Sequence, residues 1–453
     1  MKKPLIQRRR PCSGRERERG VTLALVAASI VAMLAMAALS VDVASLYNAN
    51  CELQRAADAG ALAGARSLAL AGTTGDPTNS AAQWSAACLQ AEAVARATAA
   101  QNMVGGTNVP LGLVTSAALD KNGNYCGSAS GTVAFGVNPQ VTVTISGINV
   151  PLFFAPVMRA FFSPGASRSL TVSAKATAEV YNPSAASGFA ASGLQVPVAP
   201  RCVKPWLIPN VDPRTSAPFV QVTTGTINNQ GIINTTSPGV IGEQISLRAD
   251  CKNGFSNCQL TETPPKNFNA TTLDYVPADI SGPYVAVPSG ATGSSYQEAS
   301  GGCDVGTVYE CGTANGASAD MNINPRGNLG DTAVAVRALI NQSGGYDLID
   351  TTVYPFQITA GGGNPLVVSG AIGNGQIISS SNSIVTVPIY DNTNPWPGGA
   401  TPTLTIVGYL QVFINDVAGT GHLDVTILNV SGCGTATASA VGGTSPVPVR
   451  LVQ

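Results

Sequence analysis

Histidine and charged residues are scarce in this sequence of 453 residues. Histidine occurs once, at His422, and Lys, Arg, Asp and Glu together make up 11% of the chain, against about a quarter in an average soluble protein. A single imidazole leaves little for a Ser-His-Asp triad or a histidine metal site. The formal net charge of -1 also argues against nucleic-acid binding. We therefore expect no catalytic, cofactor-binding or metal-binding residues, and no nucleic-acid partner.

The few charges are distributed unevenly around one apolar segment. Residues 1–20 carry a local charge of +6 and residues 42–453 a charge of -7, whereas residues 21–41 carry none. A helix of that length spans about 30 Å, the thickness of the hydrocarbon core of a bilayer. The sequence therefore predicts a basic cytoplasmic tail (1–20), a transmembrane helix (21–41) and an exported remainder.

Three fates are open for the apolar segment. The favoured one is an uncleaved anchor. A secretory signal is the second, because Ala35 and Ala37 form a small-x-small cleavage pattern. The third is a pilin-type leader cut between Gly20 and Val21, although Leu25 stands where pilins usually carry Glu.

The segment after the span predicts a continued helix and a second helix beside it. Residues 42–70 contain no proline and are rich in Ala and Leu. Small residues at helical spacing allow another helix to approach closely. That helix is either residues 80–95 of the same chain, which begin with a capping-box pattern at Ser80 to Gln83, or a helix of another subunit. The first reading, a helical hairpin, is favoured.

A family resemblance is carried by residues 19–65. They show, in order, a glycine-led apolar run, an acidic residue just past it, a Leu-Tyr pair and an alanine-rich motif; the residues that carry it are Asp42, Leu46, Tyr47, Leu53, Gln54, Ala57, Asp58 and Gly64. This order resembles the N-terminal region of TadE/TadG-like proteins of the Flp (tight-adherence) pilus-assembly system.

The resemblance implies a non-enzymatic component of Flp pilus assembly in the bacterial inner membrane, with its bulk periplasmic or extracellular. Its partners would be the membrane and pilus-assembly or pilin subunits, with self-association as a further option. Some relatives carry an Asp-x-Ser-x-Ser metal motif, which no Asp in this sequence begins. Two alternatives stay open: a minor pseudopilin cut after Gly20, or a secreted or surface adhesin that binds through residues 201–453.

Alternation of apolar and polar residues predicts strands farther along the chain. It occurs at residues 141–145 and 169–181, so residues 42–181 are expected to form a small α+β domain with an antiparallel sheet. Between these strands, residues 151–162 predict a short buried helix, with an aromatic foot on the membrane surface as the alternative.

Residues 182–200 predict a linker because they are rich in small residues and proline. Residues 201–453 then predict a β-rich, disulfide-braced domain, sandwich-like or irregular, with one helix at 330–341. Its best strands are 383–390, 403–414 and 422–430, and the last two flank a turn. Residues 120–124 resemble the start of a calcium loop but are interpreted as a plain turn.

Ten cysteines agree with export, where disulfides form. Cys12 lies in the predicted cytoplasmic tail. Spacing suggests four pairs: Cys251 with Cys258, Cys303 with Cys311, Cys88 with Cys126, and Cys202 with Cys433. The nine exported cysteines are an odd number, so at least one thiol, with Cys51 as the candidate, stays unpaired or pairs between chains.

Overall fold

A computed structural model describes most of the chain. The described residues are 15–74, 80–120, 123–125, 138–154, 169–182, 198–222, 231–233, 240–249, 271–309, 320–322, 329–392, 403–418, 421–432, 441–443 and 445–452. Contacts divide the chain into two compact units. One contains Met1–Ala57, Ala100–Val114 and Thr144–Lys175, and the other contains Asp58–Ala99, Thr115–Val143 and Ala176–Gln453.

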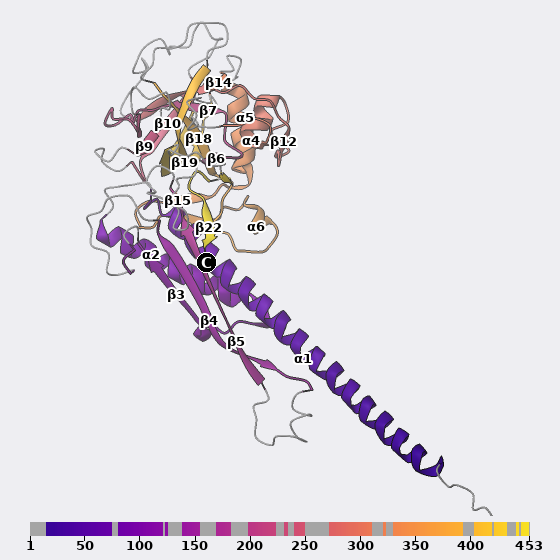
Figure 1. The fold of residues 1–453 in the computed structure, drawn as a ribbon. Helices are drawn as coiled ribbons and strands as arrows, with labels where there is room; N and C mark the ends of the chain where they lie inside the picture. Colours follow the sequence, from indigo (N-terminus) through magenta and orange to yellow (C-terminus); the bar gives the residue numbers. More distant parts are fainter. Residues whose placement is uncertain are drawn as a thin grey trace, which may run out of the picture. The chain divides into compact units, whose positions relative to one another are not determined.

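Two helices form the N-terminal part (Figure 1). Helix α1, Arg15–Leu70, runs for 56 residues without a proline to interrupt its hydrogen bonds. Helix α2, Ala81–Gln101, starts at a reciprocal capping box. The hydroxyl of Ser80 accepts from the backbone N–H of Gln83, and the side chain of Gln83 accepts from the N–H of Ser80.

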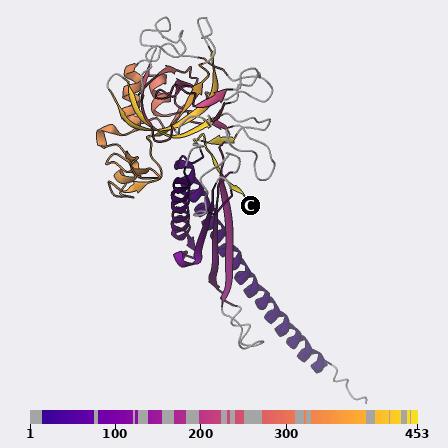
Figure 2. The ribbon, with the colours of Figure 1, turned by 90° about the vertical axis from the view of Figure 1, so that its left-hand side faces the viewer.

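A four-stranded sheet accompanies the helices. Its order is β22-β5-β4-β3, with bounds Val449–Val452, Ser169–Val180, Gln140–Pro151 and Val114–Leu119. Strand β4 alternates as predicted, with the side chains of Val141, Val143 and Ile145 fully buried. In β5 the buried and more exposed side chains alternate from Ala174 to Ala178, whereas Leu170 is 45% exposed. In both views β4 and β5 run alongside α1 (Figures 1 and 2).

The larger sheet closes into a ring. Its order is β14-β19-β18-β7-β11-β10-β20, and β19 also pairs with β20. The bounds are β14 Asp320–Asn322, β19 Thr403–Val417, β18 Ile384–Tyr390, β7 Trp206–Pro209, β11 Thr272–Pro277, β10 Gln244–Ala249 and β20 Leu423–Gly432. Pairs β10–β11 and β7–β18 are parallel and the other pairs are antiparallel. Strands β19, β18, β7, β11, β10 and β20 form the closed ring, and β14 pairs with β19 outside it. Closure removes the exposed edges of the ring strands. The sequence had left the arrangement open between sandwich-like and irregular.

Alternate residues of the ring strands build the main core. They include Trp206, Leu247, Tyr275, Val387 and Leu410, all fully buried. Helix α5, Leu329–Leu339, contributes Ala333 and Val336 to the same core, within two residues of the predicted bounds.

The other elements are short. They are β1 Met103–Val104, β2 Thr107–Asn108, η1 Leu111–Leu113, β6 Val198–Pro200, β8 Val220–Val222, β9 Gly231–Ile233, β12 Tyr284–Val285, α4 Ser295–Gly301, β13 Cys303–Asp304, η3 Gln342–Gly344, β15 Leu348–Asp350, β16 Gln357–Thr359, α6 Pro365–Val368, β17 Ile377–Ile378 and β21 Val441–Gly443.

The buried helix expected at residues 151–162 is wrong for its first four residues. Strand β4 continues to Pro151, and Phe153 and Phe154 lie in a bend with 61% and 43% of their surface exposed. Residues 155–162 lie outside the described residues, as do most of the predicted linker and Cys12, Cys126, Cys251, Cys258, Cys311 and Cys433.

Candidate functional site

The N-terminal part of α1 presents an apolar surface to its surroundings. Its window of highest mean hydropathy, at 2.4, has none of its residues buried, and among the described residues α1 alone is long and apolar enough to cross a membrane. A helix with apolar side chains on every side is stable where lipid surrounds it. Gly20 and Val21, the predicted cleavage positions, lie within this continuous helix.

Asp42 is the first charged residue after the span, and its side chain is turned inward. It is only 2% exposed. Its Oδ1 accepts hydrogen bonds from the backbone N–H groups of Phe153 at 2.8 Å and Phe154 at 3.1 Å, and its Oδ2 also accepts from Phe154 at 3.1 Å. Hydrogen bonds to a carboxylate are about twice as strong as neutral ones. Asp42 therefore holds the end of β4 against α1, in addition to marking the end of the apolar run.

One side of α1 stays apolar and exposed from the end of the span onward. Leu39, Val43 and Tyr47 follow each other at intervals of four residues, so they lie on the same side of the helix. All three are more than half exposed, and Tyr47 is 69% exposed. Leu46, its neighbour in the family motif, is half-buried. We call Leu39, Val43 and Tyr47 the apolar stripe.

The small residues farther along α1 face the chain's own second helix. A Cβ placed on Gly60 would lie 2.8 Å from the carbonyl oxygen of Ala95, and one on Gly64 would lie 2.9 Å from that of Ala91. The other side of Gly64 is filled by Val141 of β4, at 2.8 Å. The face made by these glycines is therefore covered within the chain, as the first of the two sequence readings expects.

The remaining residues of the family motif pack around this face. Leu53 and Ala57 are fully buried. The side-chain amide of Gln54 donates to the backbone carbonyl of Lys175 at 3.2 Å, and Asp58 is half-buried. Most of the motif thus supports the fold of α1, and Tyr47 is the one large motif side chain that the described residues leave exposed.

The C-terminal end of α1 and the turn after it are capped by side chains from distant parts of the chain. The side-chain amide of Asn429 donates to the carbonyl oxygen of Ala69 at 2.7 Å, and that of Asn182 donates to Thr74 at 2.9 Å. The hydroxyl of Tyr354 donates to Ala71 at 2.8 Å. These bonds satisfy carbonyls that a helix end leaves unpaired. No local pattern around Asn429 or Asn182 indicated this role.

The described cysteines pair differently from the spacing predictions. Cys202 and Cys303 form a disulfide across 101 residues, so the expected partners Cys433 and Cys311 are wrong for these two. Cys88 is buried, and its expected partner Cys126 is outside the described residues. Cys51 is a free, half-buried thiol on α1.

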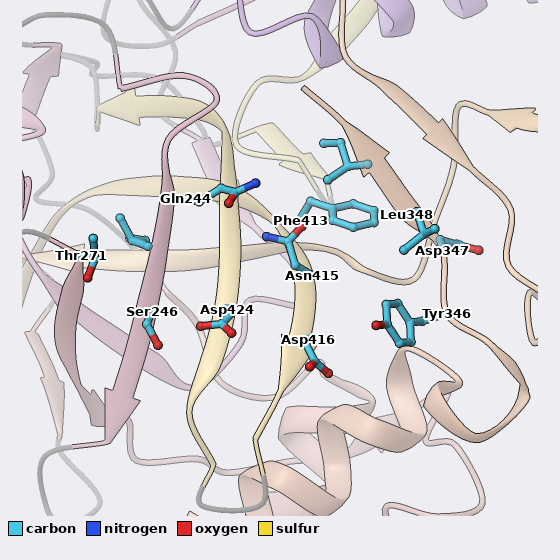
Figure 3. A pocket seen from close by; sticks show the side chains of 12 residues that line it. Gln244, Ser246, Thr271, Tyr346, Asp347, Leu348, Phe413, Asn415, Asp416 and Asp424 are labelled. Carbon is cyan, nitrogen blue, oxygen red and sulfur yellow. The ribbon is translucent and has the colours of Figure 1, made fainter. Parts of the chain in front are cut away.

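The ring unit contains a polar cavity of about 520 Å³ (Figure 3). Asp416 and Asp424 line it from β19 and β20, and Asp347 and Tyr346 line it from the segment after α5. Asp347 is occupied by other groups, since its carboxylate accepts from Asn364, Ser381 and the N–H of Gly361. The Asp347 carboxylate therefore already serves the fold.

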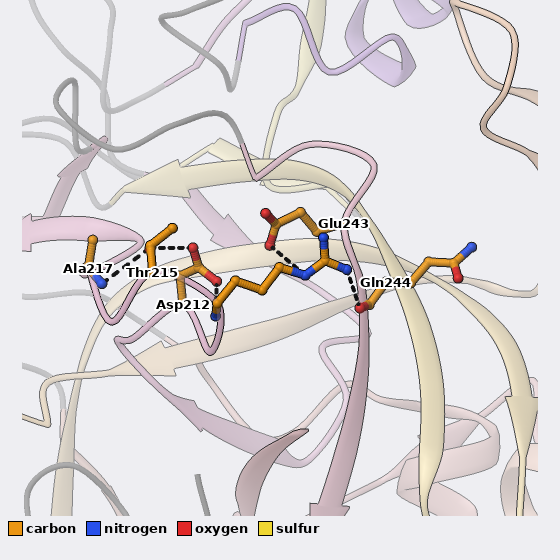
Figure 4. A network of polar contacts seen from close by, with 6 residues as sticks. Asp212, Thr215, Ala217, Glu243 and Gln244 are labelled. Carbon is orange, nitrogen blue, oxygen red and sulfur yellow. Dashed lines mark hydrogen bonds and ion pairs between the residues drawn. The ribbon is translucent and has the colours of Figure 1, made fainter. Parts of the chain in front are cut away.

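A polar network includes Gln244, which also lines this cavity (Figure 4). Arg214 contacts Glu243 at 3.8 Å and donates to the carbonyl of Gln244, and Asp212 accepts from the hydroxyl of Thr215. Burial, with the nearby charge of Asp212, raises the pKa of Glu243 to about 7. Lys204, buried in the same unit, donates to the carbonyl of Gly302 at 2.6 Å, and burial lowers its pKa to about 7.

The predicted turn at residues 120–124 satisfies its own carboxylate. Asp120 is buried, and its Oδ1 accepts from the backbone N–H of Asn124 at 2.9 Å. Gly123 has φ +73°, which closes the turn. Asp120 thus serves the backbone here.

Comparison with known proteins gives one match. No curated protein and no solved structure matches the chain. Residues 20–67 match the family Tad, described as "Putative Flp pilus-assembly TadE/G-like". The match covers the apolar span, Asp42, the apolar stripe and both packed glycines. The likeness is confined to the N-terminal region, which is similar to TadE/TadG-like Flp pilus-assembly proteins.

Proposed function

We propose that the protein is a membrane-anchored, non-enzymatic component of Flp pilus assembly. In this proposal α1 crosses the bacterial inner membrane and residues 1–20 stay in the cytoplasm. The ring unit, which is the compact unit that contains the closed sheet, lies in the periplasm or outside the cell. The proposal rests on one observation: the family match at residues 20–67 coincides with a helix whose apolar surface is exposed. The scarcity of histidine and charge supports a role without catalysis.

The apolar stripe is the surface through which we propose contact with other pilus components. The glycine face of α1 cannot serve, because α2 and β4 already occupy it. Val43 and Tyr47 lie beyond the span, where water would otherwise contact their apolar surface. An aliphatic and aromatic stripe at helical spacing fits a partner helix.

The test is the double variant Val43→Ser and Tyr47→Ser, expressed from the native locus in cells that make the pilus. Because both side chains are exposed, the protein should accumulate normally. We expect fewer pili by electron microscopy and less pilin in the sheared fraction. Leu89→Ser, an exposed apolar position on α2, is the matched control and should leave piliation unchanged. Normal piliation in the double variant would contradict the proposed surface.

The two alternative roles are separated by the N-terminus of the mature protein. A retained sequence upstream of Val21 in the membrane fraction supports the anchor. A start at Val21 identifies a processed minor pseudopilin, and a start near Ala38 in the medium identifies a secreted protein, for which adhesion by residues 201–453 becomes the leading role. Mass spectrometry of both fractions distinguishes the three.

A further inference from the structure

Two aromatic side chains remain uncovered at the point where α1 leaves the span. Phe153 and Phe154 follow the last residue of β4, and they are 61% and 43% exposed. Each large aromatic side chain left in water forgoes a substantial hydrophobic gain, so a neighbouring pair in this state indicates a contact surface. The pair is named the aromatic foot here.

The level of the foot along α1 is set by Asp42. The backbone N–H groups of both phenylalanines are bonded to the Asp42 carboxylate, and Asp42 is the residue directly after the uncharged run of residues 21–41. If that run occupies the hydrocarbon core, the foot is held at the boundary between acyl chains and headgroups on the exported side.

The backbone of the foot suits that boundary. An unpaired N–H group is costly near hydrocarbon, and the two N–H groups of the foot are both paired with Asp42. The carboxylate is itself only 2% exposed, so the contact presents aromatic rings to the lipid and keeps the charge turned inward. Aromatic side chains are enriched at this level of a bilayer.

We infer that Phe153 and Phe154 form a second membrane contact, which inserts into the lipid interface of the exported leaflet beside α1. This inference rests on the proposed membrane anchor. Its partner is the lipid itself, so it differs from the protein partner assigned to the apolar stripe. With two points of attachment, α1 and the foot, the unit that contains them would have a restricted tilt on the membrane.

Fluorescence quenching by brominated lipid tests the inference. The full-length protein is reconstituted into phosphatidylcholine and phosphatidylglycerol vesicles. One set carries bromine on the acyl chains near the headgroup, for positions 153 and 154, and a second set carries it near the chain ends, for position 34. Phe153→Trp and Phe154→Trp are measured separately, and the emission of the unmodified chain is subtracted. We expect bromine to reduce the added emission if the aromatic ring lies at the lipid interface.

Two matched variants distinguish the outcomes. Leu34→Trp lies in the span and Leu89→Trp lies on α2, and both positions are exposed. Quenching at positions 34, 153 and 154 but not at 89 supports the foot. Quenching at 34 without quenching at 153 and 154 overturns the foot and leaves the anchor standing. No quenching at 34 overturns the anchor, and the foot with it.

Discussion

Asp42 and Phe153 are separated by 111 residues in the sequence and are joined by a hydrogen bond of 2.8 Å from the Phe153 N–H to Oδ1 of Asp42. The acidic residue after the apolar span thus has a structural partner within its own chain. Its burial distinguishes it from a charge that only marks the end of the apolar run.

Replacing Asp42 should release the end of β4. Hydrogen bonds to a charged group contribute about 1.5–3 kcal/mol, so Asp42→Ala should speed amide hydrogen exchange at Phe153 and Phe154 by about one to two orders of magnitude. Asp42→Asn keeps one acceptor oxygen and should give an intermediate effect. Asn50→Ala, an exposed change on the same helix, should leave both amides protected. Unchanged exchange in Asp42→Ala would show that these bonds are unimportant in solution.

Gly64→Ala should destabilise the protein, although alanine is the better helix former. In an exposed helix the change would stabilise by about 1 kcal/mol. Here the new methyl group would lie 2.8 Å from Val141 and 2.9 Å from the Ala91 carbonyl oxygen, and such overpacking typically costs about 1–3 kcal/mol. Thermal unfolding measures the sign directly. Gly112→Ala, where a Cβ would meet nothing within 4 Å, is the control, and a rise in the midpoint for Gly64→Ala would contradict the packing.

The glycine face and the helices were predictable because their signals are local. Apolar spacing and the absence of proline gave α1 and α2, the Ser80 and Gln83 pair gave the start of α2, and alternation gave β4 and β5. The closed ring had no comparable signal. Its parallel pairs join β7 to β18 and β10 to β11, and nothing in the individual strands specifies those partners.

The site was predictable only in part. The family motif identified the correct helix, yet most of its residues serve packing, and the exposed Tyr47 cannot be separated from buried Leu53 by the motif alone. The exposure of Phe153 was masked by the apolar run around it, which is also typical of a buried helix. Long-range partners such as Asn429 carry no sequence signal at all.

The disulfide between Cys202 and Cys303 should be found by peptide mapping without reduction. Because it closes a loop of about 100 residues, removing it with Cys202→Ala and Cys303→Ala should lower the free energy of unfolding by about 2–4 kcal/mol. Cys51→Ser, at a free thiol, is the control. Recovery of Cys202 linked to Cys433 would contradict the structure.

Glu243 should make stability depend on pH. Its pKa rises from 4.5 in the unfolded chain to about 7 in the folded one, so the unfolded state binds fewer protons between these values. The contribution of Glu243 to the free energy of unfolding is therefore present below pH 4.5 and is lost as pH rises through 7. Glu243→Gln should flatten this part of the profile.

The measurement is the change in the unfolding midpoint between pH 4.5 and pH 8. This change is compared between the parent protein and the Glu243→Gln variant. Asp279→Asn, at an exposed carboxylate, should follow the parent. A variant profile that also follows the parent would show that Glu243 ionises normally in the folded protein.

The capped end of α1 has a consequence for any attempt to produce residues 201–453 alone. Asn429 and Asn182 are buried, and each donates to a carbonyl of the α1 end or the turn after it. A truncated protein that begins at residue 201 would lack Asn182, Ala69 and Thr74, and would leave the amide of Asn429 without its Ala69 acceptor, at a cost of about 1–3 kcal/mol. A product that keeps both bonds must therefore begin upstream of Ala69.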